Sequence, residues 1–158
     1  MRDCKVFWIS LAVLLGVFLA LSGIGLCGSR RTYGDISDVK YVRNYDGDTI
    51  TFDIRGVHPL LGEKVSVRLR GVDTPEIRGR CQKERRAALM AKRFVANVLK
   101  RARRIDLRRV SRGKYFRIVA DVEVDGRDLK ALLLERGLAV PYYGRRKAIC
   151  SNKGQKSF

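Results

Sequence analysis

The sequence predicts an α+β domain in which five short strands form a small barrel and two to three helices pack on it. Three observations predict this fold. Apolar residues alternate with polar ones in several short runs, one longer run has helical spacing, and the chain is 158 residues long. Once an apolar N-terminal part is set aside, this length suffices for one domain with one modest hydrophobic core.

Residues 6–26 form an uncharged, mostly apolar stretch of 21 residues between basic flanks. Its length suits a membrane anchor, whereas its basic start and its small-residue end also suit a cleavable signal peptide. Both interpretations place residues 1–31 outside the domain, and the sequence leaves them open. Both also predict export, with the domain in the periplasm, outside the cell, or held by the membrane outside the cytoplasm. The polar residues 32–38 are expected to form a linker.

The first half of the domain predicts three strands. Residues 39–44 are expected to form the first strand, and the sequence Asp-Gly-Asp at residues 46–48 predicts a turn after it. Apolar and polar residues then alternate in residues 50–54 and 65–69, separated by the loop 56–62. Each of these strands has one apolar face for a core.

The second half of the domain predicts a helix, two strands and a shorter helix. Apolar residues recur at three- and four-residue spacing in residues 83–104, which indicates an amphipathic helix. Strand-like runs follow at residues 105–110 and 117–124, and leucines at helical spacing follow from Leu129 to Gly137. A domain this small has no room for a sandwich, so the OB-fold, a five-stranded barrel that binds nucleic acid, is the expected architecture.

The charge of the chain predicts a polyanionic partner. Lys and Arg number 34 against 16 Asp and Glu, a net charge of +18. Residues 1–31 contain four basic residues and one acidic residue, so the rest carries 30 minus 15, or +15. The basicity therefore belongs to the domain and to its basic tail, residues 145–158, and indicates a nucleic acid; a domain bound to anionic lipid is the alternative.

Three clusters place charged or hydroxyl residues where the predicted strands begin or end. The first is Asp-Gly-Asp-Thr at residues 46–49. The second begins at Arg68 and ends with Asp-Thr-Pro-Glu at residues 73–76. The third is Arg-Gly-Lys-Tyr-Phe-Arg at residues 112–117. A hydrophobic core does not need such residues, so the clusters are candidates for a functional site.

In this order, the three clusters resemble the staphylococcal nuclease (thermonuclease) family. The resemblance covers residues 39–144, with Asp-Thr-Pro-Glu and its upstream arginine as the most specific part. It implies a monomeric, calcium-dependent hydrolase that cleaves phosphodiester bonds of DNA, RNA or both.

The resemblance implies a calcium site made by the first two clusters. Asp48 and Asp73 would supply carboxylate oxygens and Thr74 a backbone carbonyl, which are the hard ligands that Ca²⁺ prefers. Asp46 would assist the metal through a water molecule. A hairpin turn without a metal is the alternative for Asp46 and Asp48 when they are considered alone.

The resemblance also assigns three catalytic residues. Arg68 and Arg117 match arginines that hold the scissile phosphate, for which a guanidinium offers paired planar donors. Glu76 matches the proposed general base and would orient or deprotonate the attacking water. A solvated strand position is the alternative for either arginine alone.

The remaining matched residues would bind the substrate. Lys114 and Tyr115 resemble residues that hold a terminal phosphate, and Tyr143 resembles a tyrosine on which a nucleotide stacks. Two positions depart from the family pattern, because Phe116 replaces a glycine and Gly113 replaces an acidic residue. These departures affect the loop that leads to Arg117.

Two further questions stay open at this stage. Export would place Cys81 and Cys150 in an oxidising compartment, so a disulfide between them and a pair of unlinked thiols are both compatible with the sequence. Functionally, a nucleic-acid-binding module without catalysis and a basic membrane-surface protein are the rivals of the nuclease. The joint presence of the carboxylates and arginines favours the nuclease.

Overall fold

A computed structural model describes residues 31–113, 117–142 and 150, all within one compact unit, residues 31–158. The predicted signal or anchor, residues 6–26, lies outside the described residues, as does the basic tail 145–158 except Cys150. Among the described residues, no helix combines the length and the apolar character that crossing a bilayer requires.

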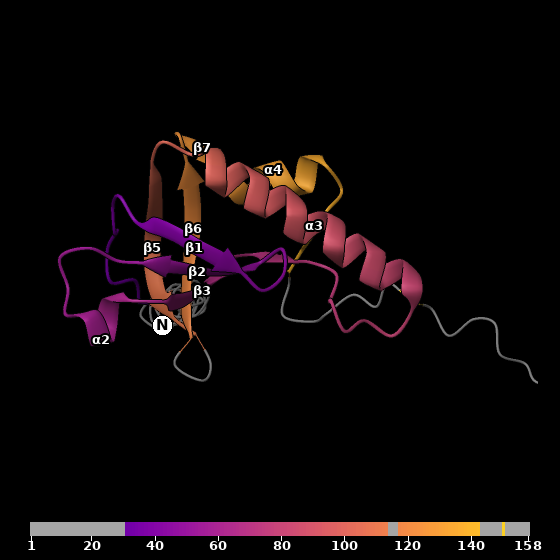
Figure 1. Ribbon diagram of the computed structural model, residues 1–158, viewed down its shortest axis with the longest axis horizontal. Helices are drawn as coiled ribbons and strands as arrows, with labels where there is room; N and C mark the ends of the chain where they lie inside the picture. The colour runs from indigo at the N-terminus through magenta and orange to yellow at the C-terminus, as the bar shows by residue number, and fades with distance from the viewer. Residues whose placement is uncertain (1–30, 114–116, 143–149, 151–158) are drawn as a thin grey trace, which may run out of the picture. The chain divides into compact units, whose positions relative to one another are not determined.

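The main sheet contains the five long strands expected from the sequence. Its order is β1-β2-β3-β6-β5, and the short strand β7 pairs with β6 (Figure 1). Pairing is antiparallel between β1 and β2, β2 and β3, and β5 and β6, whereas β3 and β6 are parallel. Strands β4 and β8 form a separate pair. The strands are β1 Lys40–Asn44, β2 Thr49–Asp53, β3 Val65–Leu69, β4 Val72–Asp73, β5 Ile105–Arg112, β6 Ile118–Val124, β7 Arg127–Asp128 and β8 Val140–Pro141.

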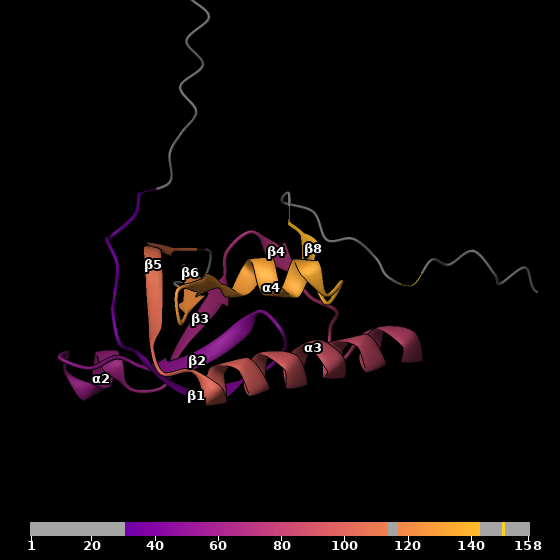
Figure 2. The same cartoon turned by 90° about the horizontal axis from the view of Figure 1, so that it is seen from above.

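Three helices occur in the described residues, so the α+β class and the helix number are confirmed. Helix α3, Gln82–Arg101, packs against β1, and α4, Leu129–Glu135, packs against β6 and β7 (Figures 1 and 2). The one-turn helix α2, Pro59–Gly62, lies in the β2–β3 loop. Helix α4 begins where Asp128 accepts a hydrogen bond from the backbone N–H of Lys130 at 2.8 Å, and Gly137 follows it with φ +62°.

The five strands predicted to form a barrel are present, but the barrel is not closed, because no ladder joins β1 to β5 in the described part of the chain. Residues 32–38, expected to be a linker, instead run beside β5. Ile36 forms an isolated bridge with Leu107, and the backbone N–H of Val39 donates to the carbonyl of Ile105 at 2.9 Å. Asp38 between them has φ 54°, a left-handed conformation that interrupts an extended strand. A few irregular hydrogen bonds between residues 33–39 and β5 therefore take the place of a ladder that would close the barrel.

The hydrophobic core lies between the sheet and the helices α3 and α4. Ile50 and Phe52 of β2 and Val67 and Leu69 of β3 are buried as expected, and α3 contributes one stripe of small and aliphatic side chains. Within this stripe Ala88 is fully buried, whereas its neighbour Ala87 is only partly buried. Because the core occupies the middle of each strand, the polar clusters are left at the strand ends. The largest fully buried apolar side chains are Phe52, Ile50, Leu69, Leu107, Leu129, Leu133, Val67, Val72, Val95 and Val122.

Candidate functional site

The loop between β1 and β2 is held by side-chain hydrogen bonds to its own backbone. Asp46 Oδ1 accepts from the backbone N–H groups of Asp48, at 3.0 Å, and of Thr49, at 2.7 Å. Asn44 Nδ2 donates to the carbonyl of Asp46 at 2.6 Å and to that of Lys92 in α3 at 3.1 Å. The buried amide of Asn44 therefore fixes the acidic loop against α3.

Gly47 lets this loop approach two other segments closely. A Cβ atom at Gly47 would lie 2.7 Å from Cγ2 of Thr74 and 2.9 Å from Cβ of Ala91. Real Cβ atoms do not tolerate such contacts, so only glycine fits without displacing a neighbour. The close approach brings the first cluster of the sequence against the second.

Asp48 is the most buried carboxylate of the site, with 1% of its surface exposed. Its Oδ2 accepts hydrogen bonds from the backbone N–H of Thr74 at 2.8 Å and from Thr74 Oγ1 at 3.0 Å. Burial raises the pKa of Asp48 to about 6, with the positive charge of Arg68 lowering it and the negative charge of Asp46 raising it. The carboxylate is therefore near half-ionised at a mildly acidic pH.

Arg68 connects the two carboxylates that the sequence assigned to a metal. One guanidinium nitrogen donates to Asp48 Oδ1, and the other donates to Asp73 Oδ1 at 2.8 Å and to the carbonyl of Val72 at 3.3 Å. Its side chain is 23% exposed, so the guanidinium is reachable from solvent. Two negative charges and one positive charge thus lie in direct contact.

A pocket of about 310 Å³ opens at this point of the surface. It is lined by Asp46 from the first cluster, by Arg68 and Glu76 from the second, and by Arg117, which precedes β6. Asp48 and Asp73 lie directly behind Arg68. Residues from three separated segments, predicted to act together, therefore meet at one pocket.

Sequence reasoning missed four residues that line the same pocket: Tyr45, Ser66, Ile77 and Arg78. Ser66 was detectable, because it lies two residues before Arg68 on β3 and side chains two apart share one face of a strand. Arg78 lies in an irregular loop, where no periodicity predicts the direction of a side chain. Tyr45 precedes the acidic turn and is 55% exposed.

The donor atoms of this region fit a hard cation. Asp48 and Asp73 each accept a hydrogen bond from the guanidinium of Arg68, so the two carboxylates already bind one positive group between them. Oxygen donors of this kind are the ones that Ca²⁺ prefers. Thr74, whose backbone N–H and hydroxyl bind Asp48, is held next to the two carboxylates.

The residues predicted to bind the rest of the substrate, Lys114, Tyr115 and Tyr143, lie outside the described residues, as does Phe116. Tyr142 is described; it is 45% exposed, and its backbone N–H donates to the carbonyl of Gly71 at 3.0 Å.

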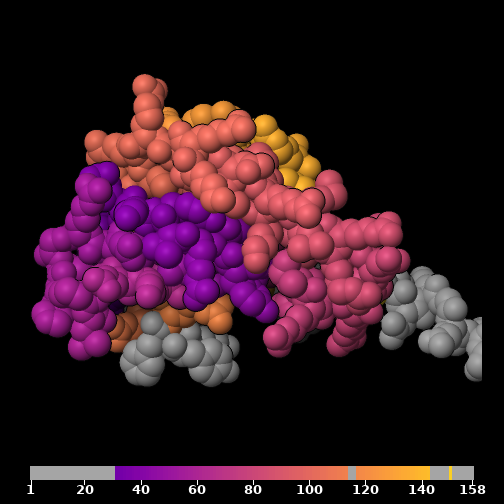
Figure 3. All heavy atoms as spheres, viewed as in Figure 1, coloured from indigo at the N-terminus to yellow at the C-terminus, as the bar shows by residue number. Residues whose placement is uncertain are grey.

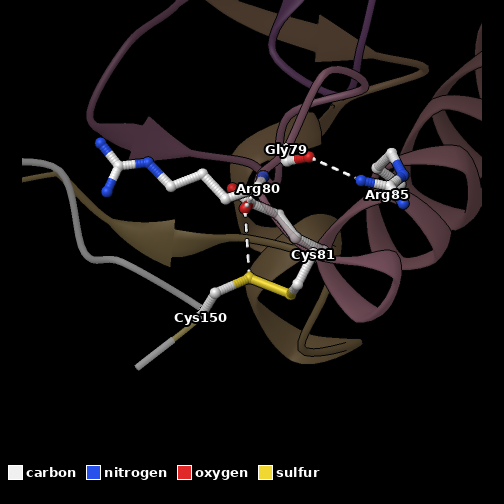
Figure 4. The surroundings of a disulfide bond; sticks show 6 residues. Gly79, Arg80, Cys81, Arg85 and Cys150 are labelled. Atoms are coloured by element: carbon white, nitrogen blue, oxygen red, sulfur yellow. Dashed lines mark hydrogen bonds between the residues drawn. A yellow bond between two sulfur atoms is a disulfide. The ribbon is translucent and has the colours of Figure 1, made fainter. Parts of the chain in front are cut away.

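The segment that carries Glu76 and Arg78 is fixed at the start of α3. The sequence left open whether Cys81 and Cys150 form a disulfide or stay unlinked thiols. In the structure a disulfide joins them at the start of α3 (Figure 4). Oε2 of Glu84 lies 3.4 Å from the sulfur of Cys150 and accepts from the backbone N–H of Arg80 at 3.0 Å. These two cysteines and Glu84 are close enough together to suggest a metal site, but the bond between the sulfurs accounts for their proximity.

Reducing the disulfide is expected to destabilise the protein. The bridge joins residues 69 positions apart, and closing a loop of this size is worth up to about 4 kcal/mol in chain entropy of the unfolded state. We therefore expect dithiothreitol to lower the melting temperature by about 5 °C or more in scanning fluorimetry. A Cys81→Ser/Cys150→Ser variant should melt at the same temperature with and without the reductant. An unchanged melting curve of the wild-type chain would contradict the prediction.

Comparison with known proteins supports the resemblance found in the sequence. A family model described as staphylococcal nuclease homologue matches residues 66–157. The match includes the second and third clusters and excludes the acidic turn at residues 46–49. None of the curated proteins compared with the chain matches it.

Proposed function

The chain belongs to the family of staphylococcal nuclease homologues, and we propose that it is a calcium-dependent nuclease that hydrolyses phosphodiester bonds of DNA, RNA or both. Membership alone indicates a nuclease-type domain that acts on nucleic acid. Metal dependence, catalysis and the residue roles that follow are what we propose beyond family membership.

The convergence of two arginines and a glutamate on one pocket carries this proposal. Arg68, Arg117 and Glu76 line a pocket of about 310 Å³, and two carboxylates lie behind Arg68. The pocket combines the groups that phosphodiester hydrolysis requires: cations for the phosphate oxygens, a carboxylate for the water, and acidic ligands for a metal ion. A module that only binds nucleic acid has no need for the acidic residues.

Asp48, Asp73 and the backbone carbonyl of Thr74 are the residues that would hold Ca²⁺, with Asp46 acting through water. When bound, the ion would supply positive charge to a phosphate oxygen and orient the attacking water. In the structure the charge of Arg68 neutralises Asp48 and Asp73. A calcium ion bound to these carboxylates would take over that role and would leave the guanidinium of Arg68 available to the substrate. Calcium binding and phosphate binding would therefore be coupled through Arg68, which lies between the two sites.

The chain's own residues perform the remaining steps. Arg68 and Arg117 hold the non-bridging oxygens of the scissile phosphate and balance the charge that grows on them. Glu76 accepts a hydrogen bond from the attacking water and orients it towards phosphorus. Asn44 and Gly47 keep the acidic loop in place, so they position the site without touching the substrate.

An exported location is part of the proposal. The uncharged stretch of residues 6–26 suits a signal or an anchor, and the Cys81–Cys150 disulfide is stable in an oxidising compartment. We propose that the domain acts outside the cytoplasm, either released or held at the membrane. A monomeric state stays a prediction, which size-exclusion chromatography with light scattering tests.

The direct test incubates the purified chain with plasmid DNA and with RNA, in Ca²⁺ or in excess chelator. The proposal expects degradation in Ca²⁺ and none in chelator. Binding of both nucleic acids without degradation would instead identify a non-catalytic binding module, and neither binding nor degradation would favour a membrane-surface protein.

The raised pKa of Asp48 predicts how calcium binding depends on pH. Its carboxyl has a pKa of about 6, so below that pH Ca²⁺ must displace a proton in order to bind. We expect the affinity for Ca²⁺ to be constant from pH 7 to 8 and to fall by up to about tenfold per pH unit below pH 6. Isothermal titration calorimetry at pH 5, 6, 7 and 8 measures this. A constant affinity down to pH 5 would contradict the prediction.

A further inference from the structure

We infer that a polynucleotide extends from the catalytic pocket along the surface between β1 and α3 to a second, basic pocket at the C-terminal end of α3. This inference rests on the proposed function for its substrate. It assigns a binding role to residues that take no part in the chemistry.

The second pocket has a volume of about 350 Å³ and a strongly basic lining. Five of its eleven lining residues are cationic, and Asp38 is the acidic one. Asp38 is bonded to Arg55 at 3.0 Å. A concave surface lined in this way attracts a phosphate backbone. The five cations are Lys40, Arg55, Lys100, Arg103 and Arg104.

The basic residues of the domain differ in whether an acidic side chain neutralises them. On β5, two arginines are paired with acidic side chains: Arg108 with Glu123 at 3.1 Å and Arg109 with Asp121 at 2.6 Å. These charges serve the fold and do not widen the nucleic-acid footprint.

Four cations along the path lack such pairing, whereas Arg55 and Arg104 in the basic pocket are paired with Asp38 and Asp106. Lys40 and Arg43 on β1, and Lys100 and Arg103 at the end of α3, are exposed, and no ion pair within the described residues involves any of the four. Two acidic residues border them. Asp53 lies opposite Lys40 on β2, and Asp125 accepts hydrogen bonds from the backbone N–H groups of Arg103 and Arg104. The balance along the path remains positive.

The two pockets lie at opposite ends of β1. Lys40 at the start of the strand lines the basic pocket, and Tyr45, just after its end, lines the catalytic pocket. Five residues at about 3.3 Å each separate them by about 17 Å. In a strand whose bases are stacked as in a duplex, phosphates are about 3.4 Å apart along the axis, so this separation corresponds to about five stacked nucleotides. Figure 3 shows the atoms of β1, in indigo, beside those of α3, in pink.

Two features make the catalytic end of the path suitable for a nucleic acid. Tyr45 is 55% exposed at the rim of the pocket, where its ring can stack on a base. Ser66 and Arg78 add a hydroxyl and a cation to the same pocket. The path therefore combines an aromatic contact at the reacting end with cations that follow the backbone, as in proteins that bind single strands without sequence preference.

The test compares two full-length triple variants with the same change in net charge. Lys40→Glu/Lys100→Glu/Arg103→Glu alters the path, and Arg31→Glu/Arg127→Glu/Arg136→Glu is the matched control, because these exposed residues lie outside β1 and α3 and line neither pocket. Fluorescence anisotropy in chelator measures binding of labelled single-stranded DNA of 4 and about 20 nucleotides over a range of salt concentrations. Circular dichroism confirms that both variants are folded.

We expect the path variant to bind the longer oligonucleotide about tenfold more weakly than the control variant, with the slope of log K against log salt reduced by about 2, for three lost phosphate contacts. Binding of the 4-nucleotide oligonucleotide should match that of the control. Equal losses in the two variants, or an equal loss for both lengths, would overturn the inference. So would a path variant that binds long DNA normally but no longer binds vesicles containing phosphatidylserine, because the patch would then serve a lipid surface.

This outcome is separate from that of the proposed function. Cleavage of a dinucleotide with a single phosphodiester bond requires only the catalytic pocket, so the path variant should cleave it at the wild-type rate. If the wild-type chain cleaves nothing in Ca²⁺, the proposed function fails, while the difference in binding still decides whether the path exists.

Discussion

Replacing Glu76 by glutamine is expected to lower kcat/KM on DNA or RNA by about 10²- to 10⁴-fold, the range that removal of a general acid or base usually produces. Glu76 lines the catalytic pocket with Arg68 and Arg117, so its carboxylate faces the place where we put the scissile phosphate. Glutamine keeps the size of the side chain but has neither the negative charge nor the basicity that orients and activates water. Steady-state kinetics on a defined oligonucleotide measures the loss.

The control for this variant is Glu63→Gln. Glu63 is an exposed acidic residue directly after α2, and it does not line the catalytic pocket. It should leave kcat/KM within about twofold of the wild-type value, as expected of a surface substitution. The rise in melting temperature on adding Ca²⁺ should be kept in both variants, because Glu76 is not among the proposed metal ligands. A Glu76→Gln variant with wild-type kinetics would remove Glu76 from the mechanism.

Replacing Asp48 by asparagine is expected to abolish both calcium binding and cleavage. Asp48 is the most buried of the proposed ligands, and it holds Thr74 and Arg68 at the same time. Asparagine can still accept the hydrogen bonds from Thr74, but it removes a full charge from the metal site and from the contact with Arg68. We expect the Ca²⁺-dependent rise in melting temperature to disappear and cleavage to fall by about 10³-fold or more.

The same variant should lose little stability when no calcium is present. The folded-state pKa of Asp48 is raised from its ordinary value of 3.8 to about 6. Between these values the folded protein binds more protons than the unfolded chain, so this carboxyl makes the wild-type protein less stable as the pH rises from about 4 to 6. Asparagine does not titrate, so this part of the pH dependence should vanish.

Urea unfolding in chelator at pH 4.5 and pH 7 measures the pH dependence of stability in the wild-type and variant proteins. The control is Asp38→Asn, which changes a carboxylate whose side chain is 63% exposed. At each pH we subtract the wild-type free energy of unfolding from that of the Asp48→Asn variant. We expect this difference to be more positive at pH 7 than at pH 4.5. An identical pH dependence in the wild-type and variant proteins would show that Asp48 ionises normally. Retained calcium binding in the variant would remove Asp48 from the metal site.

The main elements of the fold could be predicted because their patterns are local. The predicted helix, residues 83–104, and the observed helix, Gln82–Arg101, differ by three residues at most. The short strands β4, β7 and β8 were missed, because pairs of two residues leave no periodicity to detect. The sequence also did not show that the predicted barrel would stay open between β1 and β5. The positive φ of Asp38 interrupts the segment that would have completed it.

The residues of the site were predictable only in part. Asp46, Arg68, Glu76 and Arg117 were proposed from motif order and now line one pocket. Arg78 and Tyr45 line it too, but no pattern in the sequence distinguishes them from other exposed residues. The sequence likewise gave no means of separating the paired Arg108 and Arg109 from cations that face solvent.

The sequence by itself determined the alternation of strands, the amphipathic face of α3, the excess of positive charge and the three polar clusters, because these depend on residues that are near one another in the chain. Only the tertiary structure decided that Arg68 lies between Asp48 and Asp73, that Cys81 is bonded to Cys150, and which arginines are neutralised by acidic partners. The physical reason is distance. Burial, a shifted pKa and an ion pair all depend on which atoms come within a few ångströms, and it is the packing of distant segments that sets those distances.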